Sequence, residues 1–386
     1  MVKKRTLYRI VMAVVFFALL EPSAFNGTWI HEICGYIRVM SFLVSIPTYF
    51  LFKCYKNKFA NIALIFYVAI GAATILYSGK LSSDYIFLMR SVVAAIIFSG
   101  ILYRRDPIGI CKVMAWMLSV FLLFDAMTWV LPGLGYQYGA SIKCFLGTKT
   151  TITYYFIPAM IFDGVYYRIC PHREKKLAEI LVLLAFGSTV VYLLQMPIST
   201  TIISVALYVF YAVVQRWKFH VVEWICKYGF IVSTVICVLF LFGTSIGAFE
   251  YIITNVLGES GDISGRRQIW DMVFLYISQR PLLGYGLGTG IYFDVWQATN
   301  ASAHNLFLGM IIRSGFLGIS LYGLMIWYIH THNKIHDSVN GNIAQIVLFG
   351  LVVMNIAGIP EDYSITVVTY CAWLLMGSTE YLSEQL

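Results

Sequence analysis

The chain has 386 residues, of which 60% are hydrophobic and only 12% are charged. Soluble domains carry roughly a quarter charged residues, so this composition excludes an ordinary soluble domain and indicates a polytopic membrane protein. The formal net charge of +8 does not indicate a nucleic-acid partner, because the positive residues cluster beside apolar runs. The eight cysteines form no CxxC pair, so neither a disulfide framework nor a zinc site is expected.

Apolar runs of about 18 to 25 residues recur along the chain, and each is long enough to cross a bilayer. The first run follows "MVKKR" and resembles a signal peptide, but no small-residue cleavage site follows it, so we interpret it as a membrane helix. The sequence predicts an all-α polytopic protein, residues 1–386 forming a single integral membrane domain. About twelve spans are expected, at residues 7–24, 34–52, 60–78, 84–102, 109–131, 151–168, 178–195, 198–215, 227–247, 303–329, 343–360 and 363–380.

Positive residues are concentrated at the start of the chain and in every second connection between the expected spans. The alternate connections, such as "SGKLSSD", "QMPIST" and "IPEDYS", are nearly free of positive charge. By the positive-inside rule both termini are cytoplasmic. Because the positively charged connections follow even-numbered spans, the pattern favours twelve spans over eleven or thirteen.

The longest connection, residues 248–302, is expected to be an extracytoplasmic loop that carries the active-site helix between spans nine and ten. A helix is predicted at residues 265–279, with Asp262 or Ser264 as its N-cap. Its apolar residues recur at helical spacing, so we expect an interfacial helix on the outer membrane surface, with Trp270 at the interface. The glycines of "GYGLGTG" that follow predict a tight, bendable turn, and no strand precedes them as a dinucleotide fingerprint would require.

Seven positive groups are expected in the outer half of the protein, where the positive-inside rule predicts few. Three of them, Arg38, Arg90 and Arg313, lie inside expected spans. The other four lie on expected outer loops: Lys149, Arg266, Arg267 and Arg280. They could extend to lipid phosphates. The alternative, which the size of the set favours, is a binding site for a strongly anionic, lipid-anchored group.

His304 is placed at the start of the tenth expected span. On a regular helix it shares a face with Gly315 and Gly318, which would let a neighbouring helix pack closely. Arg313 then lies half a turn away and about 13 Å deeper, so it is interpreted only as a charge in need of a partner. A lone histidine at a helix start is commonly a cap or interface residue, whereas the arginine-bearing loop favours a catalytic role.

Other polar residues give weaker indications. Asp125 and Asp163 lie in spans and are expected to pair with arginines. A metal site at His330, His332 and His336 is disfavoured by their irregular spacing in a cytoplasmic connection. Eight outer carboxylates could bind a sugar or act as a base, and the sequence does not rank them: Glu21, Glu32, Glu250, Glu259, Asp262, Asp294, Glu361 and Asp362.

Three segments, "SGRRQIW", "RPLLGYGLGTG" and "SAHNLFLGMIIRSGFLG", resemble in content and order the O-antigen ligase and polymerase superfamily. The resemblance implies a GT-C-class glycosyltransferase that uses undecaprenyl-pyrophosphate-linked sugars outside the membrane, with no metal or cofactor. It implies that Arg266 and His304 occupy the functional positions and that Gly284 and Gly286 shape the turn. The family usually has a glutamate where Arg313 stands, so the pairing there is expected to be reversed.

Two further departures concern anion binding. Thr150 stands where an asparagine is common, and the connection "QMPISTTIIS" lacks the serine–arginine pair often found there. Arg38 or Arg90 is therefore expected to substitute as a phosphate-binding arginine.

The sequence thus predicts an inner-membrane polymerase of an O-antigen-type or capsular polysaccharide, with His304 and Arg266 catalytic. The residues expected to bind pyrophosphate or glycan are Arg38, Arg90, Lys149, Arg267, Arg280, Asn305 and Tyr285. Expected partners are undecaprenyl-pyrophosphate-linked oligosaccharides, membrane lipids and assembly proteins such as a chain-length regulator, but no nucleic acid.

Two alternatives remain open at this point. A ligase would move the finished glycan to another acceptor, such as lipid A core, and the motifs do not separate it from a polymerase. A transporter of lipid-linked oligosaccharides would predict an internal repeat and charges in both membrane halves, and the sequence shows neither.

Overall fold

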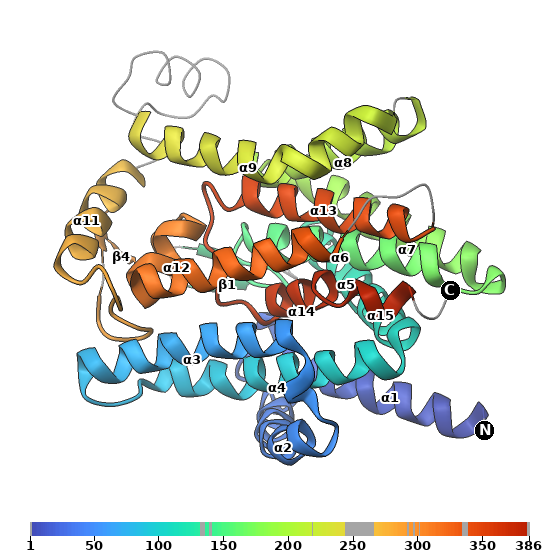
Figure 1. The fold of residues 1–386 in the computed structure, drawn as a ribbon, viewed down its shortest axis with the longest axis horizontal. Helices are drawn as coiled ribbons and strands as arrows, with labels where there is room; N and C mark the ends of the chain where they lie inside the picture. The colour runs from blue at the N-terminus through green and yellow to red at the C-terminus, as the bar shows by residue number, and fades with distance from the viewer. Residues whose placement is uncertain are drawn as a thin grey trace.

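The computed structural model describes residues 2–131, 136–138, 141–217, 219–243, 266–291, 293–295, 298–300, 302–333 and 339–383. This part of the chain is a bundle of helices with two short antiparallel hairpins (Figure 1). The helices are α1 Val2–Leu19, α2 Trp29–Leu51, α3 Lys58–Ser78, α4 Ser83–Arg105, α5 Pro107–Val130, α6 Thr151–Ile169, α7 Lys175–Gln195, α8 Ser199–Trp217, α9 Phe219–Gly243, α11 Arg266–Gln279, α12 Leu306–His332, α13 Val339–Ala357, α14 Val367–Met376 and α15 Thr379–Ser383. The hairpins pair β1 Tyr136–Tyr138 with β2 Ser141–Lys143, and β3 Phe293–Val295 with β4 Ala298–Asn300.

Within the described residues, eight helical stretches are long and apolar enough to cross a membrane. They correspond to α2, α3, α4, α5, α7, α8, α9 and α12. Three further apolar stretches are shorter: Thr6–Leu19 in α1, Asn342–Ala357 in α13, and all of α14. The expected polytopic membrane protein is therefore supported, while the expected number of twelve spans is not confirmed.

The twelfth expected span, residues 363–380, is not one continuous helix. α14 has ten residues, which at 1.5 Å per residue is about 15 Å, or half of a roughly 30 Å hydrocarbon core. All ten of its residues are buried. α14 is therefore a core helix, and its apolar character comes from burial on every side rather than from contact with lipid.

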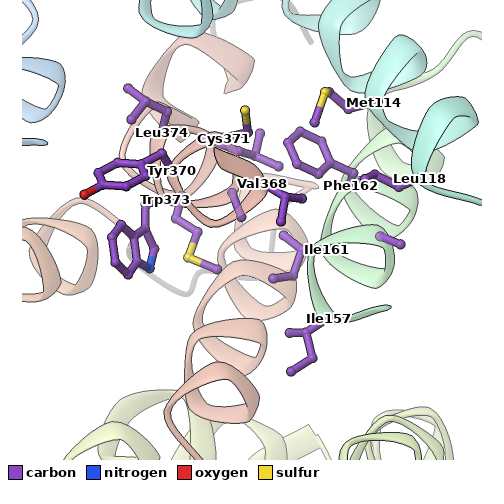
Figure 2. Packing of buried hydrophobic residues seen from close by; sticks show 14 of the residues in the cluster. Met114, Leu118, Ile157, Ile161, Phe162, Val368, Tyr370, Cys371, Trp373 and Leu374 are labelled. Carbon is purple, nitrogen blue, oxygen red and sulfur yellow. The ribbon is translucent and has the colours of Figure 1, made fainter. Parts of the chain in front are cut away.

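α14 packs mainly against α4 and α6 in the centre of the bundle. Figure 2 shows part of the buried cluster to which α5, α6 and α14 contribute side chains, and it labels Met114, Leu118, Ile157, Ile161, Phe162, Val368, Tyr370, Cys371, Trp373 and Leu374. The Tyr103 hydroxyl of α4 also donates a hydrogen bond to the Cys371 carbonyl at 3.3 Å. Because α14 is held from all sides, the connection before it has a fixed position inside the protein.

α11 lies at one end of the bundle, and both chain ends lie at the opposite end (Figure 1). Its bounds confirm the helix predicted at residues 265–279, while the proposed caps Asp262 and Ser264 lie outside the described residues. Trp270 is only 2% exposed and its indole nitrogen donates a hydrogen bond to the Ala303 carbonyl at 3.0 Å. The prediction that Trp270 lies at the membrane surface is therefore wrong, because the apolar face of α11 packs against the start of α12 instead.

α12 is broken at Gly315, where the backbone has φ +62° and ψ −161°. The carbonyls of Ile312 and Arg313 accept hydrogen bonds from the Tyr285 and Gly286 amides, both at 2.8 Å. The amides of the next turn donate to the segment just before Tyr285: Phe316 to the Pro281 carbonyl at 2.8 Å and Leu317 to the Leu282 carbonyl at 3.2 Å. Residues 281–286 thus supply the partners that a continuous helix would have supplied, as an apolar environment requires of every backbone group.

Candidate active site

Two consecutive carboxylates, Glu361 and Asp362, occupy the connection between α13 and α14. Their side chains are 3% and 0% exposed. Arg266 at the start of α11 places Nη2 3.6 Å from Glu361 Oε1, and Arg313 of α12 places Nη2 2.6 Å from Asp362 Oδ2. Buried carboxylates are strongly destabilising unless they are paired. The two arginines therefore fix this connection, and α11, α12 and the α13–α14 connection meet at one centre.

Glu361 has a second polar partner from α6. The Tyr154 hydroxyl donates a hydrogen bond to Glu361 Oε2 at 2.9 Å. Burial raises the pKa of Glu361 above its ordinary value, while Arg266, the Tyr154 hydrogen bond and the more distant Lys149 act to lower it. The raised pKa makes the Glu361 carboxylate a stronger proton acceptor than an ordinary glutamate.

Asp362 forms an ion pair with Arg313. The sequence had indicated only that Arg313, a charge inside an apolar run, requires a partner. Arg313 Nη1 also donates a hydrogen bond to Ser364 Oγ at 2.8 Å, and Ser364 Oγ donates to Asp362 Oδ1 at 2.7 Å. The first turn of α12 closes over this group at Gly309, where a Cβ atom would lie 2.1 Å from Asp362 Oδ2. Only glycine therefore allows α12 to pack this closely on the Asp362–Arg313 pair.

His304 lies immediately before α12, beside Arg266 and Asp362. It was expected to begin the span at residue 303, but the helix begins at Leu306 and His304 has φ +46°, in the left-handed region. A non-glycine residue in that region is strained, and such residues recur at functional sites. Burial and the positive charge of Arg266 lower the pKa of His304 from 6.5 to about 4, with Asp362 opposing them. The imidazole is therefore neutral at physiological pH.

The two glycines expected to admit a neighbouring helix have different surroundings. A Cβ atom at Gly315 would lie 2.2 Å from the Leu282 carbonyl group, so this face meets the segment 281–286 and not a helix. At Gly318 the nearest atoms belong to Ser314 of the same helix, and Phe66 of α3 follows at 3.6 Å. The regular-helix geometry used to separate His304 from Arg313 does not hold, because His304 precedes the helix and both residues interact electrostatically with Asp362.

Gly284 and Gly286 shape the turn that enters the break in α12. Their φ angles are +66° and +83°. A Cβ atom at Gly284 would lie 2.6 Å from the Ile312 carbonyl oxygen, and one at Gly286 would lie 2.2 Å from Thr74 Oγ1. The turn expected from the glycines is thus present, and its close contacts with backbone atoms of α12 at Gly284 and with Thr74 of α3 at Gly286 hold it in place.

The other expected cations have different surroundings. Lys149 is exposed and close enough to Glu361 to lower the pKa of that carboxyl group. It therefore joins Arg266, Arg313, Glu361 and Asp362 in what we call the central cluster. Arg38 is paired with Glu21, with 2.5 Å between Nη1 and Oε2. Arg280 stacks on the ring of Tyr77 at 4.8 Å from its centroid. Arg90 is half-buried in α4, and the side chain of Arg267 in α11 lies outside the described residues.

Asn305 and Tyr285, expected to bind substrate, are both tied to the protein. Asn305 is fully buried, its Oδ1 accepts a hydrogen bond from the Leu308 amide at 3.0 Å, and its Nδ2 donates to the Ile359 carbonyl at 2.8 Å. Asn305 thus caps α12 and links it to the carboxylate-bearing connection. The Tyr285 hydroxyl donates to the Tyr276 carbonyl at 2.9 Å. Both residues hold the segments that carry His304 and Arg313.

The membrane-embedded aspartates do not pair with arginines among the described residues. Asp125 accepts a hydrogen bond from the Leu146 amide at 2.7 Å, and Asp163 accepts one from Ser119 Oγ at 3.1 Å. Of the three histidines considered for a metal, His332 stacks on the ring of Tyr328 and His336 lies outside the described residues.

Sequence reasoning named Glu361 and Asp362 but could not rank them, and it missed Tyr154. The one available signal was the adjacent acidic pair in "IPEDYS", between two apolar runs in an otherwise uncharged connection. Tyr154 gave no signal, because a tyrosine near the start of an apolar helix is common and its partner is 207 residues away in sequence.

Residues 180–323 match the family model described as O-antigen ligase. The matched region begins within α7 and ends within α12, at residue 323, and it includes Arg266, the glycine turn, His304 and Arg313. It supports the O-antigen ligase and polymerase superfamily without separating the two activities. No curated protein matches the chain.

Proposed function

We propose that this protein is a membrane glycosyltransferase that polymerises a bacterial surface polysaccharide. The donor is a glycan chain on undecaprenyl pyrophosphate, and the acceptor is a lipid-linked repeat unit on the outer face of the membrane. The convergence of Arg266, His304 and Glu361 from three separate segments carries the proposal. The family match over the segments that hold Arg266 and His304 supports the same class of reaction.

The charge of the central cluster suits an anionic leaving group. Lys149, Arg266 and Arg313 carry three positive charges, Glu361 and Asp362 carry two negative ones when ionised, and the difference is one net positive charge. The Arg266–Glu361 contact of 3.6 Å is loose beside the 2.6 Å contact of Arg313 with Asp362. Arg266 can therefore turn from Glu361 to a pyrophosphate oxygen, whereas Arg313 stays with Asp362.

In the proposed reaction the acceptor hydroxyl oxygen attacks the anomeric carbon of the donor glycan. The bond between that carbon and the pyrophosphate oxygen breaks, and undecaprenyl pyrophosphate leaves with the electron pair. Arg266 and Lys149 stabilise the charge that develops on the leaving group, the effect that commonly contributes most in such transfers. The hydroxyl proton passes to a neighbouring base.

His304 and Glu361 are the two candidate bases. A histidine with a pKa of about 4 is neutral but weakly basic, so by itself it orients the acceptor hydroxyl better than it deprotonates it. A bound pyrophosphate would add negative charge beside His304 and raise its pKa towards the range where it is an efficient base. Glu361, once Arg266 has turned away, loses the interaction that most lowers its pKa and is able to take up the proton.

Replacement of His304 by alanine tests the proposal. We expect His304→Ala to abolish polymer and leave single repeat units on the carrier lipid, with the protein still inserted in the membrane. His172→Ala is the matched control, because His172 is exposed in a short helix before α7 and remote in sequence from the cluster. Carrier-linked glycan profiles of deletion strains that express each variant give the measurement. An unchanged chain-length distribution in His304→Ala would contradict the assignment of His304 as a catalytic residue.

The same profiles separate the alternatives. A ligase variant would leave long chains on the carrier lipid, because polymerisation would continue without transfer to the final acceptor. A transporter variant would leave repeat units on the inner side of the membrane, inaccessible to glycosidase added to intact spheroplasts. Single repeats that are accessible from outside are the outcome expected of a polymerase.

A further inference from the structure

A cavity of about 250 Å³ lies among α2, α4, α6 and the connections that follow α1 and α13. Tyr154 lines it, and the hydroxyl of the same tyrosine contacts Glu361. The exposed Asn26 also lines it, so the cavity reaches the protein surface. The side chain of Tyr154 therefore separates the cavity from the Arg266–Glu361 pair, and the cavity is accessible from the protein surface.

The charged groups of this cavity neutralise one another. Glu21 lies between two partners: Arg38 Nη1 is 2.5 Å from Oε2, and His31 Nδ1 is 3.1 Å from Oε1. The side chains of Arg38 and Glu21 are 7% and 4% exposed, and their formal charges cancel. A pyrophosphate gains little here compared with the cluster around Arg266. The pair instead presents donors and acceptors in fixed positions, which suits a neutral ligand with several hydroxyl groups.

Aromatic rings form the apolar part of the same cavity. Phe87 lies under the Arg38 guanidinium, 4.9 Å from the ring centroid, and Tyr154 and Tyr155 contribute from α6. A sugar ring has an apolar C–H face and a hydroxyl-bearing edge, so it matches aromatic walls with a few fixed polar groups. The volume is below the roughly 300–1,000 Å³ of pockets for drug-sized ligands, and fits a single ring rather than an oligosaccharide.

We infer that the Glu21–Arg38–His31 cavity is a subsite for one uncharged sugar ring of the glycan substrate. The inference rests on the proposed function for its biological meaning, and it assigns Arg38 to sugar hydroxyls instead of to pyrophosphate. Tyr154 then joins the two sites: its ring forms a wall of the sugar cavity, and its hydroxyl positions Glu361. A sugar held here lies next to the carboxylate that serves as a candidate base.

Saturation-transfer NMR on the full chain in lipid nanodiscs tests the subsite, since glucoside detergents would compete for it. The probes are methyl glycosides of glucose, galactose, N-acetylglucosamine and rhamnose, with inorganic pyrophosphate as competitor. Ser91→Phe fills the cavity that Ser91 lines, and Ser320→Phe, on the exposed side of α12, is its matched control. Glu21→Gln keeps the shape of the cavity and removes the charge of the carboxylate.

We expect at least one glycoside to bind the wild-type protein and Ser320→Phe, and to lose its signal in Ser91→Phe. Binding to Glu21→Gln should be roughly tenfold weaker, as for loss of a charged hydrogen-bond partner. His304→Ala should bind the glycoside normally even if it makes no polymer, so failure of the catalytic proposal and failure of the subsite give different results. Undiminished binding in Ser91→Phe, displacement by pyrophosphate, or no glycoside binding at all would overturn the subsite.

Kinetics with the same variants assign the bound sugar to a substrate. A raised KM for the lipid-linked repeat unit in Glu21→Gln, at saturating donor, indicates the acceptor sugar. A raised KM for the glycan donor alone indicates the donor sugar. An unchanged KM for both substrates would contradict the subsite.

Discussion

At the scale of single residues, the site depends on charges that are buried only because each has a partner. The Asp362–Arg313–Ser364 group is held by short contacts and is sealed by Gly309. The Glu361–Arg266 contact is longer and includes an arginine that is 19% exposed. The two ion pairs therefore have different roles. The tight Arg313–Asp362 pair fixes the backbone, whereas Arg266, in the loose and partly exposed pair with Glu361, is free to bind a substrate instead.

His304 provides a test of this environment that does not require substrate. Its pKa is about 4 in the folded protein and close to 6.5 in an unfolded chain. Between these values the unfolded state binds more protons, so stability falls as the pH falls through this window and is unaffected above it. Discounted for partial exposure, the loss is on the order of 2 kcal/mol.

We therefore expect the thermal unfolding midpoint of the wild-type protein to fall more steeply from pH 7 to pH 4.5 than that of His304→Gln. The difference between the two curves removes the contribution of Glu361 and other carboxylates, which titrate in both proteins. His172→Gln should follow the wild-type curve. Parallel curves for wild type and His304→Gln would show that His304 is not buried in its neutral form.

At the scale of elements, the break in helix α12 explains how the segment 281–286 is held against the core beside Arg313. The break at Gly315 admits residues 281–286, whose backbone completes the hydrogen bonds of Ile312, Arg313, Phe316 and Leu317. Discontinuous membrane helices of this kind are tolerated where other backbone groups satisfy the freed ones. The segment 281–286 is thereby attached to the core at the level of Arg313.

Substitution of Gly315 tests this attachment against a matched glycine in the same helix. Gly315→Ala should be strongly destabilising, because alanine is strained at φ +62° and its Cβ would lie 2.2 Å from the Leu282 backbone. Gly323→Ala has no atom within 4 Å of the added Cβ and should be neutral or up to about 1 kcal/mol more stable. Thermal unfolding midpoints and polymer yield give the comparison. Equal effects of the two substitutions would contradict the proposed role of the break.

The same elements show which structural features are encoded locally. Continuous apolar runs predicted α3, α4, α5 and α7 to within a few residues, because length and hydropathy are properties of each segment alone. The start of α12 and its break depend on partners in residues 281–286 and 358–359, far away in sequence. An apolar run such as that of α14 is expected both for a helix surrounded by lipid and for a helix buried in protein. Only the ten-residue length of α14 shows that it is a core helix and not a membrane span.

The carboxylates of the site could not be ranked for a similar reason. Glu361 and Asp362 have no local feature that separates them from the other outer acidic residues. Their importance comes from Arg266, Arg313 and Tyr154, which approach from three helices. Arg266 and Arg313, in contrast, could be singled out from the sequence, because a positive charge inside an apolar run, or in a connection that the positive-inside pattern predicts to be poor in positive charge, is itself unusual.

At the scale of the whole molecule, the arrangement in Figure 1 separates the chain ends from the site. α11 and the β3–β4 hairpin lie at one end of the bundle, and the N- and C-termini lie at the other. With the positive-inside pattern, we propose that the termini are cytoplasmic and that the cluster around Arg266 faces the outside. A lipid-linked substrate would then reach the cluster from the outer leaflet without crossing the membrane.

Cysteine labelling in intact cells tests this orientation. The native cysteines are all buried, so background labelling should be low. Lys80→Cys places a thiol in the exposed connection between α3 and α4, and Lys56→Cys places one in the exposed connection between α2 and α3. We expect a membrane-impermeant maleimide to label Lys80→Cys in intact spheroplasts and Lys56→Cys only after lysis. Because α3 joins the two positions, the reverse result would invert the bundle and place the arginine cluster on the cytoplasmic side, which an outer-face polymerase does not allow.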